Sequence, residues 1–270
     1  FQFLEILITK FGRLCLTNLL YLIFFAPFVY VIFQMLLTQD INRKLLYLPI
    51  YLLLALLYGP ATAGLTYIQR KTIAGEAVFT VTDFFDQFRK NFKQGIIMGL
   101  LDGIFIFGAM IYASNFIDIL LAVIYVEGTV TLQSAVMWGG VFLVTLIYFT
   151  MRYYIYMMMV TVELKMRQLI RNALAFVVLG APTNILTFFI CIALIIVYFA
   201  LIPYTYFVVA VFGVSLIGLI INFNAYSKVK THLIDPVTKP EQEQGDEEKI
   251  FSDQPVEESR QKNDETSDQN

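Results

Sequence analysis

The sequence is poor in charged residues, cysteine and histidine. Only 15% of its 270 residues are Asp, Glu, Lys or Arg, whereas soluble domains contain about 25%. Neither Cys15 nor Cys191 is placed to form an extracellular disulfide, and these two isolated thiols and the lone His232 make no metal site. The sequence also lacks HExxH, Walker-type and GxSxG motifs. We therefore expect no enzyme activity, no metal, no cofactor and no nucleic-acid partner.

Long apolar runs dominate the rest of the chain. Hydrophobic residues make up 58% of it, with 25 Phe and 16 Tyr, and no charged residue occurs from 172 to 226. As one helix this stretch would extend roughly 80 Å, too long for a single crossing of a hydrocarbon core about 30 Å thick. It must fold back, and Pro203 is the natural turn. This stretch alone predicts two membrane crossings.

The same rule predicts an all-α, polytopic membrane bundle of six transmembrane helices over residues 1–226. Helices are expected because every backbone polar group in lipid needs an internal partner, and these runs far exceed the length of a barrel strand. The first run is expected to stay as a span, since its apolar core is too long for a cleaved signal peptide. The predicted spans lie near 14–37, 45–68, 95–117, 134–160, 172–198 and 203–225.

Basic residues flank alternate connections between these spans. The opposite connections hold only Arg43 and Lys44. Because basic loops stay on the cytoplasmic side, both termini are predicted to be cytoplasmic in a multi-pass protein of the cell membrane. The residues on the predicted cytoplasmic side are Lys10, Arg13, Arg70, Lys71, Arg89, Lys90, Lys93, Lys165, Arg167, Arg171, Lys228 and Lys230.

An apolar run at 119–126 is too short for a further crossing. Three placements fit it: the run prolongs the third helix outward, lies along the outer interface, or dips into the membrane and returns. A full crossing would invert the orientation of everything downstream. We therefore expect this run to stay outside.

The C-terminal segment 227–270 differs sharply in composition from the rest. It contains six basic and twelve acidic residues, three prolines and few large apolar residues. Such a segment buries too little surface to offset the entropy of ordering, so we expect a disordered, acidic cytoplasmic tail. Its simplest role is to keep the protein soluble on the cytoplasmic side of the membrane. The alternative is that it docks a basic partner.

A polar segment at 69–94 separates the second and third spans. Within it, Thr82 or Asp83 is a suitable N-cap for an amphipathic helix with aromatic residues on one face and charges elsewhere. This helix is expected at the cytoplasmic interface, either with its aromatic side in the lipid bilayer or docked on another protein. The candidate residues are Asp83, Phe84, Phe85, Phe88, Arg89, Lys90, Asn91, Phe92 and Lys93.

Two opposite charges lie inside predicted spans. Asp102 follows Gln94 by eight positions and Arg152 precedes Thr161 by nine, which places both roughly 12–14 Å from the cytoplasmic boundary. We expect an intramembrane ion pair between adjacent antiparallel helices. One interpretation is a pair that aligns the helices, which we favour because a compensated pair offers no free charge to a substrate. The other is a solute or proton pathway.

A second intramembrane feature is the small-residue segment 59–64. Gly59, Pro60 and Gly64 predict an interruption of the second span, because proline removes a backbone hydrogen bond and glycine lets neighbouring helices approach. Broken helices form binding sites in some transporters. A packing kink is the commoner outcome and the one we favour.

Several stretches of the sequence, taken together, resemble a known family. They are Asn18-Leu19-Leu20-Tyr21 with Pro27, GPATAG at 59–64, Tyr67, Arg70, Gly75-Glu76, Asp83-Phe84-Phe85 and Asn91-Phe92-Lys93-Gln94. On these stretches the sequence is similar to the YesL-type family of integral membrane proteins of Gram-positive bacteria, a domain of unknown function, most closely over 14–100. The resemblance implies a membrane protein encoded beside sugar-uptake transporters and glycan-degrading enzymes, and it supplies no catalytic residues.

Two functional hypotheses follow. In the first, the protein is an accessory or regulatory component of carbohydrate uptake, whose cytoplasmic helix and tail contact sugar-transporter membrane subunits. In the second, it is itself a small-solute transporter or permease, with Asp102, Arg152 and the segment 59–64 near its pathway. The sequence makes no prediction of the oligomeric state.

Overall fold

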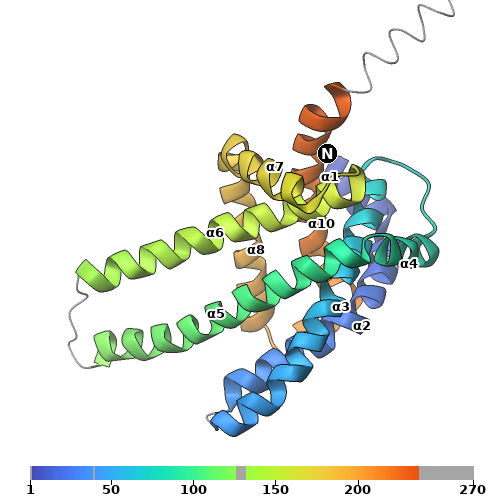
Figure 1. The fold of residues 1–270 in the computed structure, drawn as a ribbon. Coiled ribbons are helices and arrows are strands. Elements are labelled where there is room, and N and C mark those ends of the chain that lie inside the picture. The colour runs from blue at the N-terminus through green and yellow to red at the C-terminus, as the bar shows by residue number, and fades with distance from the viewer. Residues whose placement is uncertain (1, 39, 126–131, 237–270) are drawn as a thin grey trace, which may run out of the picture. The chain divides into compact units, whose positions relative to one another are not determined.

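The computed structural model of the protein describes the backbone of residues 2–38, 40–125 and 132–236, and the side chains of these residues apart from 109–135. Within these ranges the regular structure is helical (Figure 1). The α-helices are α1 (Gln2–Thr9), α2 (Phe11–Leu37), α3 (Ile41–Ile73), α4 (Thr80–Lys90), α5 (Phe92–Tyr125), α6 (Leu132–Thr161), α7 (Met166–Leu179), α8 (Ala181–Ala200), α9 (Thr205–Val208) and α10 (Val214–Val229). The π-helical turns are η1 (Val209–Gly213) and η2 (Lys230–Ile234).

The chain divides into two compact units, 1–228 and 229–270. The first unit contains the candidate site. In the second unit, residues 230–234 form the π-helical turn η2. Helical structure is therefore present beyond residue 226, where the transmembrane domain was predicted to end. The greater part of the predicted acidic tail, 237–270, lies outside the described residues.

Five helices in the described parts of the chain are long and apolar enough to cross a membrane. The third predicted span, 95–117, lies within α5, whose side chains are described only as far as Gly108. This span, the total of six and the orientation therefore stay predictions. The five candidate spans are Phe11–Leu37, Ile41–Ile73, Val136–Thr161, Ala181–Ala200 and Thr205–Ile234.

The apolar run at 119–126 continues a helix. α5 runs without a break from Phe92 to Tyr125, which corresponds to the first of the three placements considered for this run. Its position outside the membrane is not tested by the helix boundaries and stays a prediction.

The fifth predicted span, 172–198, is not one continuous helix. The structure divides this stretch at Gly180 into α7 and α8, and the candidate span begins at Ala181. Pro182 lies in the first turn of α8, where its missing N–H costs nothing. The Asn184 side chain donates to the carbonyl oxygens of Phe176 (3.1 Å) and Val177 (3.3 Å), which satisfies acceptors at the end of α7. The sequence on both sides of Gly180 is apolar and uncharged. Hydropathy therefore does not reveal the boundary between α7 and α8.

Stacked aromatic rings join α2 to α3, which form a hairpin (Figure 1). The ring of Phe28 stacks on Tyr51 at 5.3 Å between centroids and on Tyr58 at 4.9 Å. The Tyr21 and Thr62 hydroxyls are hydrogen-bonded at 3.1 Å. Aromatic pairs of this geometry add to the free energy of burial, and the hairpin contributes most of the residues of one hydrophobic core cluster.

Buried amides join α2 and α3 to the region of η1 and α10. Asn18 donates to the carbonyl oxygens of Val209 and Ala210 at 3.1 and 2.7 Å. Gln69 donates to the Ser215 carbonyl oxygen at 2.8 Å. A π-helical turn such as η1 leaves backbone acceptors out of the α-helical pattern, and Asn18 satisfies two of them.

Glycine allows α3 and α5 to touch through their backbones. A Cβ atom added to Gly59 would overlap the Gly95 carbonyl, and one added to Gly99 would overlap the Ala55 carbonyl. On Gly95, a Cβ would lie 2.7 Å from the Pro60 nitrogen. Small residues spaced in this way bring helices to close approach in membranes, so these positions set the distance between α3 and α5.

We expect Gly99→Ala to destabilise the protein. Its Cβ would displace the Ala55 backbone, and overpacking of this kind costs about 1–3 kcal/mol. Gly108→Ala, on the same helix, is the matched control because nothing lies within 4 Å of its Cβ position. Thermal unfolding in detergent should show a lower midpoint for Gly99→Ala and an unchanged one for Gly108→Ala; equal midpoints would contradict the close contact.

Candidate functional site

The structure brings Asp102 of α5 and Arg152 of α6 together. The Arg152 Nε donates to Asp102 Oδ2 at 2.8 Å. The Asp102 side chain is 1% exposed and that of Arg152 is 18% exposed. An ionised group buried in this way is costly unless it is paired and hydrogen-bonded, so the immediate surroundings of this pair decide what it can do.

Two tyrosines complete the hydrogen bonding of the Asp102 carboxylate. Tyr148 donates its hydroxyl to Oδ1 at 2.6 Å, and Tyr156 donates to Oδ2 at 3.2 Å. With Arg152, three donors therefore meet this carboxylate, and all three lie on α6. Hydrogen bonds of this kind replace the water that an ionised carboxylate loses on burial.

Tyr58 of α3 connects the charge pair to a third helix. Arg152 Nη2 donates to the Tyr58 hydroxyl. The guanidinium carbon also lies 5.4 Å from the Tyr58 ring centroid and 5.0 Å from that of Tyr156, within the range of cation–π interaction. The pair therefore joins α3, α5 and α6 at one level.

Sequence reasoning missed the three tyrosines. A signal for two of them was present: Tyr148 and Tyr156 lie four residues before and after Arg152, the spacing that places side chains on one face of a helix. Tyr58 carried no comparable signal, because its approach depends on how α3 crosses the other two helices.

Neutralising one member of the pair should cost more stability than neutralising both. We expect Arg152→Gln to lose about 3–5 kcal/mol, because it leaves a buried carboxylate uncompensated. The double variant Asp102→Asn/Arg152→Gln should recover part of that loss. Thermal unfolding and the yield of monodisperse protein measure both effects. Strictly additive losses in the double variant would show that the two side chains do not act as a pair.

The small-residue segment does not break α3. The helix runs from Ile41 to Ile73 with Pro60 inside it, so the predicted interruption is wrong for the backbone. Both sides of the segment are instead occupied: Gly59 faces α5, and a Cβ on Gly64 would lie 3.0 Å from the Phe84 ring of α4. The segment is therefore packed against neighbouring helices on both sides, and a role in packing stays the favoured prediction.

The helix predicted in the polar segment is α4, which begins earlier than expected. Its N-cap is Phe79, so the prediction of Thr82 or Asp83 as N-cap is wrong. Asp83 lies in the first turn, where Oδ2 accepts from the Phe79 backbone N–H and from Lys71 Nζ, both at 3.1 Å. A carboxylate in this position satisfies an N-terminal donor and favours the helix dipole, and it also holds α4 to the end of α3.

The aromatic face of α4 packs inside the protein. Phe84 is fully buried, and its ring lies 6.5 Å from that of Phe24 on α2. The Phe88 ring lies 5.2 Å from Phe24, and Phe85 contacts Phe84 edge-on at 5.4 Å. Phe84 therefore faces neither lipid nor another protein, because α2 and α3 already cover its ring. Phe85 and Phe88 are only partly buried, so for these two rings a contact with lipid or another protein stays a prediction.

Further polar contacts fasten the α4–α5 junction to the connection before α7. Lys90 pairs with Glu163 at 3.2 Å, and Gln94 Nε2 donates to the Leu164 carbonyl at 2.9 Å. Asn91 lies between α4 and α5 and donates to the Gln87 side chain at 2.9 Å. The remaining predicted residues Arg89, Phe92 and Lys93 are exposed, Phe92 belonging to α5.

Removal of the Phe84 ring should detach α4. We expect Phe84→Ala to cost about 3–5 kcal/mol through the cavity left against Gly64 and Phe24, and to increase hydrogen exchange in α4. Phe79→Ala is the matched control, since Phe79 is 75% exposed. Hydrogen–deuterium exchange by mass spectrometry distinguishes the two; if Phe84→Ala leaves exchange in α4 unchanged, the docking of this helix does not depend on the ring.

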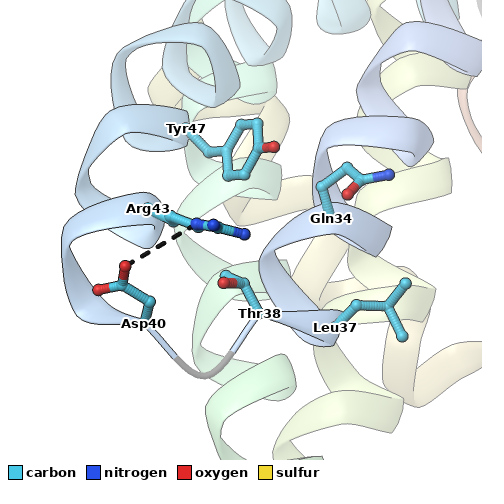
Figure 2. Close-up of a pocket in the computed structure, with 6 residues that line it drawn as sticks. All are labelled: Gln34, Leu37, Thr38, Asp40, Arg43 and Tyr47. Atoms are coloured by element: carbon cyan, nitrogen blue, oxygen red, sulfur yellow. Dashed lines mark ion pairs between the residues drawn. The ribbon is translucent and has the colours of Figure 1, made fainter.

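A pocket lies elsewhere, at the connection between α2 and α3 (Figure 2). It has a volume of about 370 Å³ and includes Asp40 and Arg43, which pair at 3.9 Å and are both well exposed. None of the predicted site residues lines it. Among the residues that the structure describes, no group of three or more His, Cys, Asp or Glu is arranged to hold a metal ion. The six residues of the pocket are Gln34, Leu37, Thr38, Asp40, Arg43 and Tyr47.

Comparison with known proteins gives one match. Residues 14–116 match the family profile described as "Protein of unknown function, DUF624". No curated protein and no solved structure matches the chain. The matched segment contains most of α2, all of α3 and α4, and the described side chains of α5. It includes Asp102, the glycine contact and the docked helix, but not Arg152. The chain is thus similar, over this segment, to a family whose function is unknown, and it has the five candidate spans of a multi-pass membrane protein.

Proposed function

We propose that the protein is an accessory or regulatory membrane component associated with carbohydrate uptake, and that it does not itself carry solute. The observation that supports this most directly is the state of Asp102, which accepts from Arg152, Tyr148 and Tyr156. A charge so fully matched has little to offer a passing solute. The association with carbohydrate uptake rests on the resemblance to the YesL-type family.

The exposed side of α4 is the surface that we assign to a partner. The buried aromatic face fixes the helix on α2 and α3, and Asp86 and Arg89, with Lys93 just beyond the helix, remain exposed. A rigidly held, charged helix suits recognition of a complementary charged surface, because little ordering entropy is lost on binding. The partners proposed are membrane subunits of a sugar transporter.

A stand-alone small-solute transporter is the second candidate. The observation that favours it is the presence of Arg152, paired with Asp102, within the candidate span Val136–Thr161, since ionisable groups inside spans often mark solute or proton pathways. Arg152, whose side chain is 18% exposed, would then be the group nearest to the solute. This candidate requires water to reach the level of the charge pair.

Affinity purification distinguishes the two candidates. Tagged protein should recover transporter subunits in stoichiometric amounts from native membranes in mild detergent. Arg89→Glu/Lys93→Glu should reduce that recovery about tenfold or more through reversed charge at the contact. The matched control is Arg43→Glu/Lys44→Glu, which reverses the same amount of charge at the N-terminal end of α3, away from α4. This variant should leave the recovery of transporter subunits unchanged. Recovery of the protein alone, together with solute flux in liposomes, would contradict the accessory role and support the transporter.

A further inference from the structure

α7 has one side buried against the protein and one side exposed. Leu169, Ala173 and Phe176 are buried, and the Phe176 ring stacks on Tyr154 of α6 at 5.1 Å between centroids. The opposite side of the helix is uncovered. The helix is therefore held against the bundle along one side and presents a second surface outward.

The outward surface of α7 is apolar along most of its length. Ile170 is 37% exposed, Leu174 52% and Val178 73%. Their spacing of four residues places all three on one helical face. An exposed aliphatic row of this kind is unfavourable in water and is typical of helices that lie in a membrane interface.

Arginines accompany this apolar row. Arg167 and Arg171 are exposed and one helical turn apart, and Lys165 precedes them. Glu163 is the last acidic residue before Asp235 in the sequence, and Glu163 is paired with Lys90. The surface therefore carries positive charge with no acidic residue of its own helix to offset it, which complements an anionic ligand.

The next helix places this surface at the membrane boundary. The candidate span of α8 begins at Ala181, and only Gly180 separates it from α7. The C-terminal end of α7 must then lie where the hydrocarbon core begins, and its apolar row lies beside lipid rather than in bulk water. Arginine side chains at this level reach the phosphates of the headgroups while their stems stay among acyl chains.

We propose that α7 lies in the plane of the bilayer and forms a binding site for an anionic phospholipid. Arg167 and Arg171 bind the headgroup phosphate, and Ile170, Leu174 and Val178 contact the acyl chains. Arg167 and Arg171 lie on the side predicted to be cytoplasmic. The site is separate from the α4 surface assigned above, and its existence does not depend on the proposed function.

Native mass spectrometry of the purified full chain tests this proposal with defined lipids. We expect phosphatidylglycerol to be retained in preference to phosphatidylcholine. Arg167→Gln/Arg171→Gln should lower retention of phosphatidylglycerol about tenfold or more, because each basic residue near an anionic surface strengthens binding about fivefold. Glycerol 3-phosphate at the same concentration should not compete, because it lacks acyl chains. Competition by this soluble phosphate would overturn the lipid assignment in favour of a free phosphate site.

The matched control is Arg43→Gln/Lys44→Gln, which removes two basic residues at the far end of α3 and should leave retention unchanged. Equal losses in both variants, or no loss in the α7 variant, would overturn the proposal. A nitroxide on Val178→Cys, in a chain without Cys15 and Cys191, gives a second test in vesicles containing phosphatidylglycerol. We expect stronger relaxation by oxygen than by a polar nickel complex; the reverse would place α7 in water and also overturn the proposal.

Discussion

An ionised carboxylate buried in an apolar bundle must find its hydrogen-bond donors within the protein, and Asp102 imposes that requirement on this fold. Its three donors come from α6, and Arg152 is held in turn by Tyr58 of α3. The glycine contact between α3 and α5 brings these helices close enough for that arrangement. The contact of Arg152 with Tyr58 thus depends on the close approach of α3 to α5 that the glycines allow.

The pairing of Asp102 with Arg152 could be predicted from the sequence because helical rise gives depth directly, and two opposite charges at one depth attract. The division between α7 and α8 could not be predicted from hydropathy, because Gly180 and Pro182 interrupt a stretch that is apolar on both sides. The Asn184 side chain completes the end of α7 through the Phe176 carbonyl, eight residues earlier in the chain. Hydropathy does not register a hydrogen bond of this kind, and only the structure revealed it.

The amphipathic helix α4 shows a further limit of sequence patterns. The stripe containing Phe84 and Phe88 predicts an apolar face but does not identify what covers it. A bilayer, a partner protein and the protein's own helices can each bury such a face. Here α2 and α3 cover the face. α7 presents the opposite case, because its aliphatic row remains exposed beside arginines. The two helices therefore differ: the Phe84 ring of α4 packs inward, whereas the aliphatic row of α7 is not covered by the protein.

The central claim is that the level of Asp102 and Arg152 is a packed junction of helices closed to water. Cysteine accessibility tests it most directly, with single cysteines at Ala61, Ala63 or Met98, all fully buried, and at the exposed Phe79 as a control. In a chain lacking its two native cysteines, a membrane-impermeant thiol reagent should label position 79 in inverted vesicles and leave the three buried positions unmodified. Labelling of the buried positions at a comparable rate would reveal a water-filled pathway and contradict the account.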